Sequence, residues 1–257
     1  YGEGPVREIA IDPFYIYATP VTNRQFNDFV NGTGYRTEAD EFGWSFVFHA
    51  HVPKKVTAEP VPGVPWWRKV DRANWRRPEG PGSNIKKRME NPVVHVSIRD
   101  ARAYCSWAGK RLPTEAEWEA AGRGGLVQKR YAWGDELTPN GKHQCNIWQG
   151  NFPEKDSAED GFAGTSPVKA FPANGYGIYS VSGNVWEWCH DYWSPFYHRS
   201  GPEKNPTGPT SGNRHVMRGG SFLCHASYCN RYRIAARTSN TSDSSTANMG
   251  FRCVRDV

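Results

Sequence analysis

The amino-acid sequence predicts an irregular α/β (α+β) fold with little regular secondary structure. Its 257 residues include 26 glycines and 19 prolines, which disfavour long helices. They also include 11 tryptophans, 12 tyrosines and 12 phenylalanines, whereas disordered chains are poor in aromatic residues. No repeat or clear linker divides the chain, and its length does not require two cores. We therefore predict a single loop-rich domain over residues 1–257 with an aromatic core.

Charge and hydropathy argue against two classes of partner. The formal net charge is +6, but Lys and Arg are spread along the chain and form no basic stripe of the kind that binds nucleic acid. No run of 18 apolar residues is present, so no segment is expected to span a membrane. We predict a protein that binds neither nucleic acid nor a membrane.

Short strands and one helix are predicted near the start of the chain. Residues 6–11 and 14–17 are rich in β-formers and flank an Asp-Pro break. A helix should follow, with Thr22 or Asn23 as its N-cap and a glycine at 32 or 34 as its end. Three apolar residues at helical spacing form its buried face: Phe26, Phe29 and Val30.

Residues 50–92 are rich in Pro, Gly, Arg and Lys, which is typical of a long surface excursion. Three tryptophans should anchor it: Trp66, Trp67 and Trp75.

Two further helices are predicted from their capping residues. Ser97 with Asp100 should open one that ends at Gly109. Its buried face should carry Ile98, Ala101, Cys105 and Ala108. Thr114 with Glu117 should open the next helix, which ends in the glycine-rich run 122–125. Beyond it the spacing of glycines predicts short strands and turns.

The candidate site lies in the run 218–237, where Cys224 and Cys229 are five residues apart. Two cysteines that meet form a disulfide or bind a soft metal, and thiolates favour Cu(I), zinc or iron–sulfur clusters over hard cations. Gly219 and Gly220 precede the pair and permit close backbone approach. Spacing alone leaves both the disulfide and the metal site open. Three arginines that follow could hold carboxylates or peptide carbonyls: Arg231, Arg233 and Arg237.

The remaining cysteines do not identify a site by themselves. The chain has six cysteines but no Cys-x-x-Cys pair, and no spacing typical of a zinc finger. Without that pair, a thiol–disulfide oxidoreductase is disfavoured. Moderate cysteine use leaves the cellular compartment open.

Motifs along nearly the whole chain resemble the formylglycine-generating enzymes, also called sulfatase-modifying factors. They include Val-Thr-Asn-Arg-Gln-Phe (21–26), Asn-Pro-Val-Val-His-Val-Ser (91–97), Lys-Arg-Leu-Pro-Thr-Glu-Ala-Glu-Trp-Glu (110–119) and Gly-Asn-Val-Trp-Glu-Trp (183–188). The last two mark only the wider fold superfamily. The specific motif is Cys-His-Ala-Ser-Tyr-Cys-Asn-Arg-Tyr-Arg (224–233).

The resemblance implies a fold and a reaction. The fold is irregular and related to C-type lectins. The activity is a copper-dependent oxidation, by O₂ and with a thiol reductant, of the cysteine in a Cys-x-Pro-x-Arg motif of an unfolded sulfatase polypeptide to Cα-formylglycine. Breaking a C–H bond beside sulfur calls for a redox metal. The alternatives are a non-catalytic, calcium-stabilised peptide-binding relative of the same fold and a lectin-like module that uses calcium alone.

The resemblance also implies roles for single residues. Cys224 and Cys229 would bind Cu(I), with Ser221 and Tyr228 beside them in the catalytic site. The substrate cleft would be bordered by Trp44, Ser45, Trp186, Arg237 and Asn248. Trp44 follows Phe42-Gly43 where some members carry an acidic residue, which places the local peptide contacts in question.

Calcium is the second cofactor that the resemblance implies. One site would use Asn146, Ile147, Asp160 and Phe162, because oxygen ligands suit Ca²⁺. A second would use Ser180, Gly183, Val185 and Glu187, with Ser180 in place of the usual Asn. Cys105 and Cys253 match a family disulfide, whereas Cys145 and Cys189 are expected to stay unpaired. We further expect a monomer in a bacterial cytoplasm, with the ER lumen as the alternative location.

Overall fold

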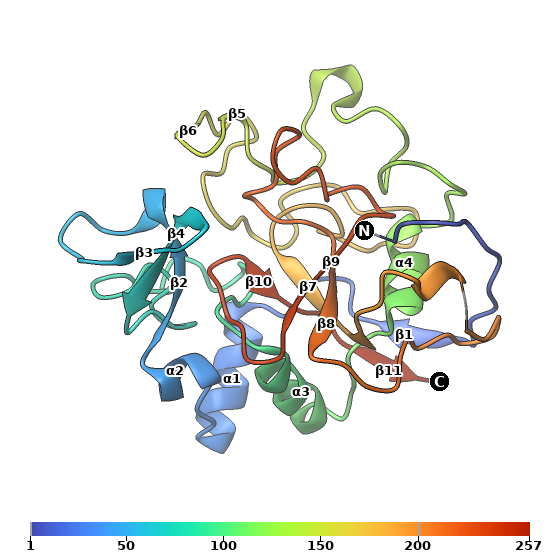
Figure 1. The fold of residues 1–257 in the computed structure, drawn as a ribbon, viewed down its shortest axis with the longest axis horizontal. Coiled ribbons are helices and arrows are strands. Elements are labelled where there is room, and N and C mark those ends of the chain that lie inside the picture. Colours follow the sequence, from blue (N-terminus) through green and yellow to red (C-terminus); the bar gives the residue numbers. More distant parts are fainter. Residues whose placement is uncertain (1, 200) are drawn as a thin grey trace.

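A four-stranded sheet lies at the centre of the computed structural model, which describes residues 2–199 and 201–257 (Figure 1). Its strand order is β10-β7-β8-β9. Strands β7, β8 and β9 are antiparallel neighbours, and β10 runs parallel to β7. The bounds are β7 Trp186–Tyr192, β8 Arg214–Arg218, β9 Arg237–Thr241 and β10 Met249–Gly250. Strand β9 is therefore an edge strand.

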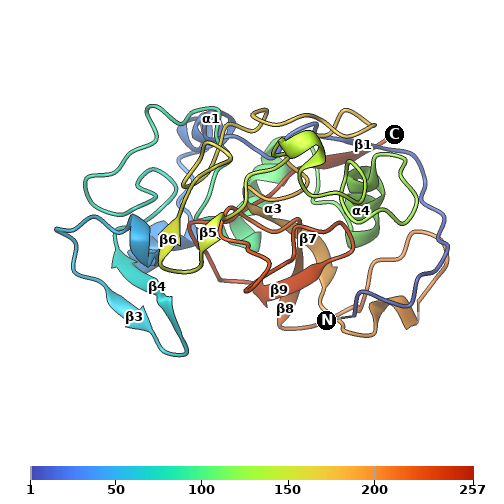
Figure 2. The same cartoon turned by 90° about the horizontal axis from the view of Figure 1, so that it is seen from above.

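Three smaller sheets surround the central one. The antiparallel sheet β2-β4-β3 contains β2 Trp44–Phe48, β3 Glu59–Val61 and β4 Val64–Asp71. The β3–β4 hairpin lies at the end of the molecule away from α4 (Figure 2). Two-stranded pairs join β1 Phe14–Ile16 to β11 Val254–Asp256 and β5 Gly150–Asn151 to β6 Lys155–Asp156.

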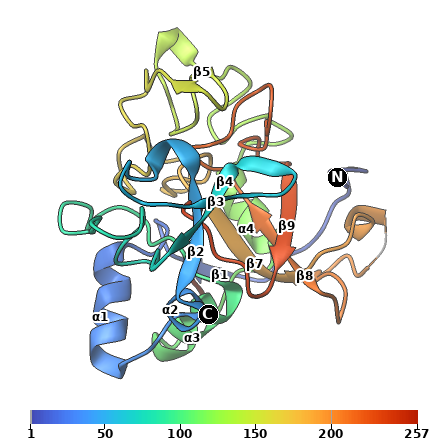
Figure 3. The same cartoon turned by 60° about the vertical axis from the view of Figure 1, so that its left-hand side comes forward.

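The α-helices are short, and three of them group at the opposite end from β5 (Figure 3). Their bounds are α1 Asn23–Thr33, α2 Glu38–Phe42, α3 Ile98–Trp107 and α4 Glu115–Arg123. Single 3₁₀ turns occupy His49–His51, Pro139–Gly141 and Tyr197–Arg199. None of the helices in the described ranges has the length and apolar character that crossing a bilayer requires.

The predicted helix boundaries are confirmed because their caps are local. Thr22, Ser97 and Thr114 are the N-caps of α1, α3 and α4, each in a reciprocal capping box with the residue three positions later. Helices α1 and α4 end at glycines with positive φ, Gly34 at 70° and Gly124 at 58°.

The predicted fold differs from the structure in three segments. Residues 6–11 form no strand and contribute only one isolated bridge, from Ala10 to Lys204. Helix α2 was not predicted. The excursion 50–92 contains the β3–β4 hairpin, and Trp75 within it is fully buried in the main core. Tryptophan burial thus ties this segment to the domain.

The main core is aromatic, as the composition predicts. Phe26 of α1 packs edge-on against Trp75 at a ring-centroid distance of 5.2 Å and is stacked on Tyr104 of α3 at 5.9 Å. Phe251 contacts both rings of this helix pair. Such pairs add about 0.5–1.5 kcal/mol each to area burial. The core therefore fastens α1 and α3 to the segment that carries β10.

The cysteines outside the candidate site are all buried. The sulfurs of Cys105 and Cys253 lie 3.3 Å apart as free thiols, so the structure brings the expected pair together without the expected bond. Cys145 and Cys189 are free and buried, as predicted.

A buried charge cluster connects α4 to the central sheet. Glu115, the first residue of α4, accepts hydrogen bonds from Arg218 at the end of β8 (2.5 Å) and from Arg237 at the start of β9 (2.5 and 2.7 Å). All three side chains are essentially inaccessible. The backbone N–H of Glu115 donates to Asp191 on β7 (2.8 Å). The cluster fixes the strand ends from which the site loop emerges.

Replacing Asp191 with asparagine should reduce the pH dependence of stability. Burial and the negative charge of Glu115 raise the pKa of Asp191 to about 7. Between about pH 4 and pH 7 the unfolded chain loses a proton that the folded protein keeps, so the free energy of unfolding falls as pH rises. Urea unfolding of Asp191→Asn should show a gain on the order of 2 kcal/mol at pH 8 and little gain at pH 4. Equal gains at both pH values would contradict an ionisation effect.

Candidate active site

The loop after β8 and the edge strand β9 form a cleft with a volume of about 190 Å³. Side chains from five separate parts of the chain line it. They include Trp66, Trp67, Phe152, Trp186, Ser221, Cys224, Tyr228, Cys229, Arg231, Thr238, Asn240, Thr246 and Asn248. Four predicted catalytic residues, Ser221, Cys224, Tyr228 and Cys229, thus converge on one cleft.

A single tight turn brings the two cysteines together. The carbonyl of His225 accepts the N–H groups of Tyr228 (3.1 Å) and Cys229 (2.9 Å). The Cα atoms of Cys224 and Cys229 are 4.9 Å apart, and the two residues form a disulfide. Cys224 is buried, with 1 % of its surface exposed, whereas Cys229 is half-buried. Cys229 is therefore the cysteine that a partner in the cleft reaches first.

The two glycines before this turn are required by close backbone contacts. Gly219 and Gly220 have φ of 92° and 75°, values that favour glycine. A Cβ on Gly220 would lie 3.0 Å from the backbone of Arg231 and Tyr232. The site loop therefore folds back directly on the residues that follow the second cysteine.

Ser221 is held so that its hydroxyl remains a donor. It accepts hydrogen bonds from Asn248 Nδ2 (2.8 Å) and from the N–H of Leu223 (3.3 Å). A hydroxyl has two acceptor lone pairs and one proton. Both acceptor positions are filled, so the remaining proton can be donated to a group in the cleft.

Aromatic rings form one wall of the cleft. Tyr228 stacks on Phe152 with centroids 4.3 Å apart, and Trp66 meets Tyr228 edge-on at 5.0 Å. Burial raises the pKa of Tyr228, so the phenol stays protonated near neutral pH. Trp66 had been predicted only as an anchor of the long excursion, and Phe152 carries no sequence signal that predicts its place here.

Three of the five predicted substrate contacts do not lie in the cleft. Trp186 and Asn248 line it. Ser45, by contrast, is fully buried and bonded to His95 and Ser245, and Arg237 is held by Glu115. Trp44 packs instead against Phe42, Phe46 and Lys69. Ser45 and Arg237 are therefore too deeply buried to contact a substrate directly, whereas the substrate contact of Trp44, which is partly exposed, stays a prediction.

The arginines after the cysteine pair also separate. Arg231 lines the cleft. Arg233 forms a bidentate ion pair with Glu3 at 2.7 and 2.9 Å. Only Arg231 is therefore placed to meet a carboxylate or a peptide carbonyl in the cleft.

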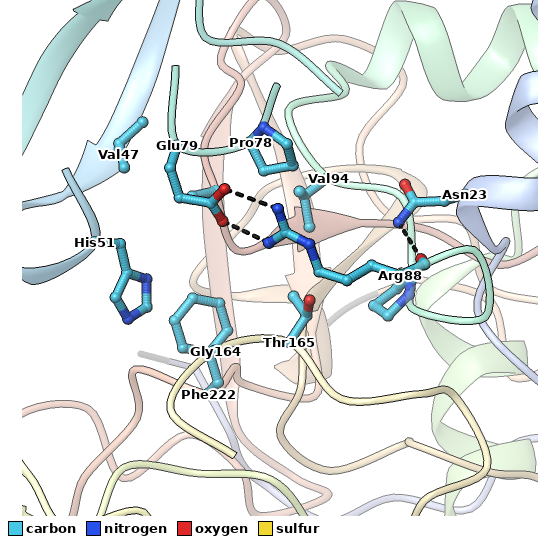
Figure 4. Close-up of a pocket in the computed structure, with 12 residues that line it drawn as sticks. Asn23, Val47, His51, Pro78, Glu79, Arg88, Val94, Gly164, Thr165 and Phe222 are labelled. Carbon is cyan, nitrogen blue, oxygen red and sulfur yellow. Dashed lines mark hydrogen bonds and ion pairs between the residues drawn. The ribbon is translucent and has the colours of Figure 1, made fainter. Parts of the chain in front are cut away.

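A second, smaller cavity of about 30 Å³ lies behind the site loop (Figure 4). Glu79 and Arg88 both line it and are hydrogen bonded directly to each other at 2.5 and 2.8 Å. His51 stacks on Phe222 of the site loop at 5.5 Å, and burial lowers the pKa of His51. A space of this size accommodates roughly one or two waters. The packing of His51 against Phe222, beside this small space, supports the site loop from behind.

The first predicted calcium site has a suitable set of oxygens. Asn146 Oδ1 is buried without a hydrogen-bond partner, although its amide group donates to Gly164. Asp160 accepts from the N–H groups of Ile147 (3.0 Å) and Phe162 (2.9 Å), and burial raises the pKa of Asp160. A buried acceptor without a donor, beside a carboxylate without a cation, fits a hard metal ion.

The second predicted calcium site does not fit. Both carboxylate oxygens of Glu187 accept from Arg252 (2.6 and 2.7 Å), and one also accepts from Trp118 (2.7 Å). The charge of Glu187 is thus already balanced by a buried guanidinium. The hydroxyl of Ser180 donates to Val168. Gly183 and Val185 could supply only backbone carbonyls, so the expected ligand set lacks its charged member.

Comparison with known proteins identifies the relatives of this chain. Residues 1–257 match the family description "Sulfatase-modifying factor enzyme 1-like domain". A protein of Thermomonospora curvata named formylglycine-generating enzyme is 60% identical over 260 residues, covering 99% of this chain and 86% of that protein. A mouse protein named inactive C-alpha-formylglycine-generating enzyme 2 is 48% identical, covering 98% and 78%. The solved structure of PvdO from Pseudomonas aeruginosa shares the fold, with a TM-score of 0.69 at 23% identity, covering 100% and 85%.

Proposed function

Because this chain belongs to the family of sulfatase-modifying factor enzyme 1-like domains, we propose that it converts a cysteine of a sulfatase polypeptide to Cα-formylglycine. The observation that carries the proposal is the convergence of Cys224, Cys229, Ser221 and Asn248 on one cleft. The substrate would be an unfolded segment with the motif Cys-x-Pro-x-Arg.

The proposed reaction balances with O₂ and two further electrons. The side chain –CH₂–SH becomes –CHO, the sulfur leaves as H₂S, and O₂ provides the aldehyde oxygen and one water. The substrate carbon gives two electrons to O₂, and a thiol reductant gives two more with two protons. Protein side chains alone perform this oxidation poorly, which is the reason to invoke a redox metal.

Cu(I) suits the donors that the cleft offers. Cys224 and Cys229 are close enough to share one ion once reduced, and the cleft wall carries no histidine or carboxylate. Two thiolates without harder ligands favour Cu(I). When bound, the metal would supply the one-electron chemistry with O₂. In the oxidised, metal-free protein the same pair forms the disulfide.

The remaining residues would bind and orient the peptide. Tyr228 and Trp66 provide an apolar wall beside the half-exposed Cys229. Residues 238 and 240 of β9 line the cleft, and the free edge of that strand can hydrogen bond an extended peptide. Ser221, as a donor, would hold a sulfur or oxygen atom of the reacting group.

The deciding experiment measures the mass of the product. The reduced protein is incubated with Cu(I), O₂, a thiol reductant and a Cys-x-Pro-x-Arg peptide, and we expect a loss of about 18 Da at the peptide cysteine. A peptide with serine in place of that cysteine is the matched control. An unchanged peptide mass with copper-loaded protein would reject the enzyme and favour a non-catalytic, peptide-binding relative. A monomer in a bacterial cytoplasm remains a prediction.

A calcium ion at Asp160 is the second part of the proposal. If the ion binds the folded protein, calcium in excess over its dissociation constant should raise the thermal midpoint, since 100-fold excess adds about 2.7 kcal/mol. A chelator should lower the midpoint again. Asp160→Asn should lose this calcium response, whereas Asp135→Asn, at an exposed aspartate, should keep it. A calcium response that survives in Asp160→Asn would disprove the site.

A further inference from the structure

A chain of buried polar groups leads from His95 to the active-site serine. The ring nitrogens of His95 lie 2.8 Å from Ser45 Oγ and 2.8 Å from the carbonyl of Pro78. Ser45 Oγ is in turn 2.8 Å from Ser245 Oγ. The side chains of His95 and Ser45 are fully buried, and Ser245 is 5 % exposed. None of these three residues lines the cleft.

The direction of these hydrogen bonds is fixed by the protonation of the ring. Burial lowers the pKa of His95 to about 4, so the ring is neutral at pH 7 and has one donor and one acceptor nitrogen. The carbonyl of Pro78 can only accept, so Nε2 carries the proton. Nδ1 can then only accept, and Ser45 Oγ is its donor; Ser45 Oγ also lies 2.8 Å from the hydroxyl and 3.0 Å from the carbonyl oxygen of Ser245.

The three residues after Ser245 connect these groups to the cleft. The N–H of His95 donates to the carbonyl of Thr246 (3.0 Å), and the N–H of Ala247 donates to Phe46 on β2 (3.0 Å). Thr246 Oγ1 donates to Asn248 Oδ1 (2.6 Å), which leaves Asn248 Nδ2 to donate to Ser221 (2.8 Å). Asn248 is thereby held at both ends of its amide, by Thr246, which follows Ser245, and by Ser221.

We propose that His95 is a positioning residue of the active site: its contacts with Ser45 and Thr246 hold segment 245–248 in place, and with it the Asn248 amide that donates to Ser221. The role is additional to the proposed function and rests on it for its effect on turnover. His95 does not touch the cleft, so it acts only through segment 245–248.

The backbone conformation of residue 95 is further evidence that this position requires a particular side chain. Its φ is 58°, a left-handed conformation that is uncommon outside glycine and in which asparagine, aspartate and histidine are enriched. Sparsely populated backbone conformations persist where the surroundings determine them strongly. Here one residue satisfies Pro78, Ser45 and Thr246 at once, which a glycine could not do.

Two substitutions of His95 test the two hydrogen bonds of its imidazole ring separately. In His95→Asn the amide oxygen can take the place of Nδ1 and accept from Ser45, and asparagine tolerates the left-handed backbone. In His95→Gln the longer amide can donate to Pro78 but does not reproduce the Nδ1 acceptor. Ser45→Ala removes the same link without touching the backbone of residue 95. His215→Gln is the control, because His215 is also buried with its pKa lowered by burial to about 4.

The test is hydrogen exchange of the Asn248 side-chain amide, assigned by NMR with Asn248→Asp. We expect exchange at least about tenfold faster in His95→Gln and Ser45→Ala than in the wild type, because segment 245–248, which carries Asn248, loses its anchor at Ser45 and opens more readily. His95→Asn and His215→Gln should exchange like the wild type. Unchanged exchange in the first pair, or equal acceleration in all four variants, overturns the proposal.

Turnover gives a second readout. In His95→Gln and Ser45→Ala, kcat should fall about 10- to 100-fold, with KM for the peptide changed less than twofold. The reason is that a misplaced Ser221 disturbs the geometry of the reacting groups more than it weakens peptide binding. His95→Asn should restore most of kcat. If the wild-type protein does not convert the peptide, the proposed function fails, while the exchange measurement still decides whether His95 positions Asn248.

Discussion

Replacing Cys224 or Cys229 with serine should abolish formation of the aldehyde. Under the proposed function, either change removes one of the two sulfurs that would bind copper in the cleft. We expect kcat/KM to fall at least about 10³-fold in each single variant and no further in the double variant, because groups that act as a unit are not additive. Single-turnover assays with the copper-loaded protein, read by peptide mass, measure this effect.

Cys189→Ala provides the matched control for this prediction. Cys189 is a buried thiol on β7, burial raises its pKa, and it lies outside the cleft. Its loss should leave turnover and Cu(I) affinity, measured by competition with a Cu(I) chelator, near wild-type values. Retained tight Cu(I) binding in Cys224→Ser or Cys229→Ser would show that the metal lies elsewhere.

Helices α1, α3 and α4 and the cysteine turn could be predicted because their signals are local. A capping box such as Ser97 with Asp100 lies within four residues, and its hydrogen bonds form wherever the helix is placed. The glycines at 219 and 220 likewise predict a tight return of the chain. These features required no knowledge of what packs against them.

The errors in the site arose from side-chain direction. Successive residues of a strand point to opposite faces. On β2 the burial pattern alternates, so Ser45 points into the protein while Trp44 remains partly exposed. The same alternation on β7 places Trp186 in the cleft and directs Glu187 to Arg252. Adjacent motif residues therefore could not all share one role.

Other contacts depend on residues far apart in the sequence. Arg237 looks like a substrate ligand from its neighbours, but Glu115 is 122 positions away and holds it. Phe152 reaches Tyr228 from the β5–β6 hairpin, which has no periodic pattern. No window of the sequence contains both partners, so only the fold reveals these pairs.

Replacing Glu115 with glutamine should have the largest effect on stability. Glu115 is the shared carboxylate of two fully buried guanidinium groups, Arg218 and Arg237. Its neutralisation leaves Arg218 with Glu119 but removes the carboxylate that holds the buried Arg237, and breaking such a buried pair costs about 3–5 kcal/mol. Guanidinium chloride unfolding should show a lower midpoint with an unchanged slope. Because these arginines end β8 and begin β9, surviving folded protein should also bind peptide less well.

Glu117→Gln tests whether this loss is specific to the buried charge. Glu117 lies on the same helix, and glutamine preserves its capping role. Its ion pair with Arg111 is partly exposed, so the change should cost at most about 1 kcal/mol.

In Glu115→Gln the pKa of Asp191 should fall, because the neighbouring negative charge that helps raise it is gone. The ionised Asp191 is then no longer repelled by Glu115 and compensates part of the lost negative charge beside the arginines. Asp191→Asn, which stabilises the wild type at pH 8, should therefore destabilise Glu115→Gln, and the absence of this reversal would contradict the shared electrostatic cluster.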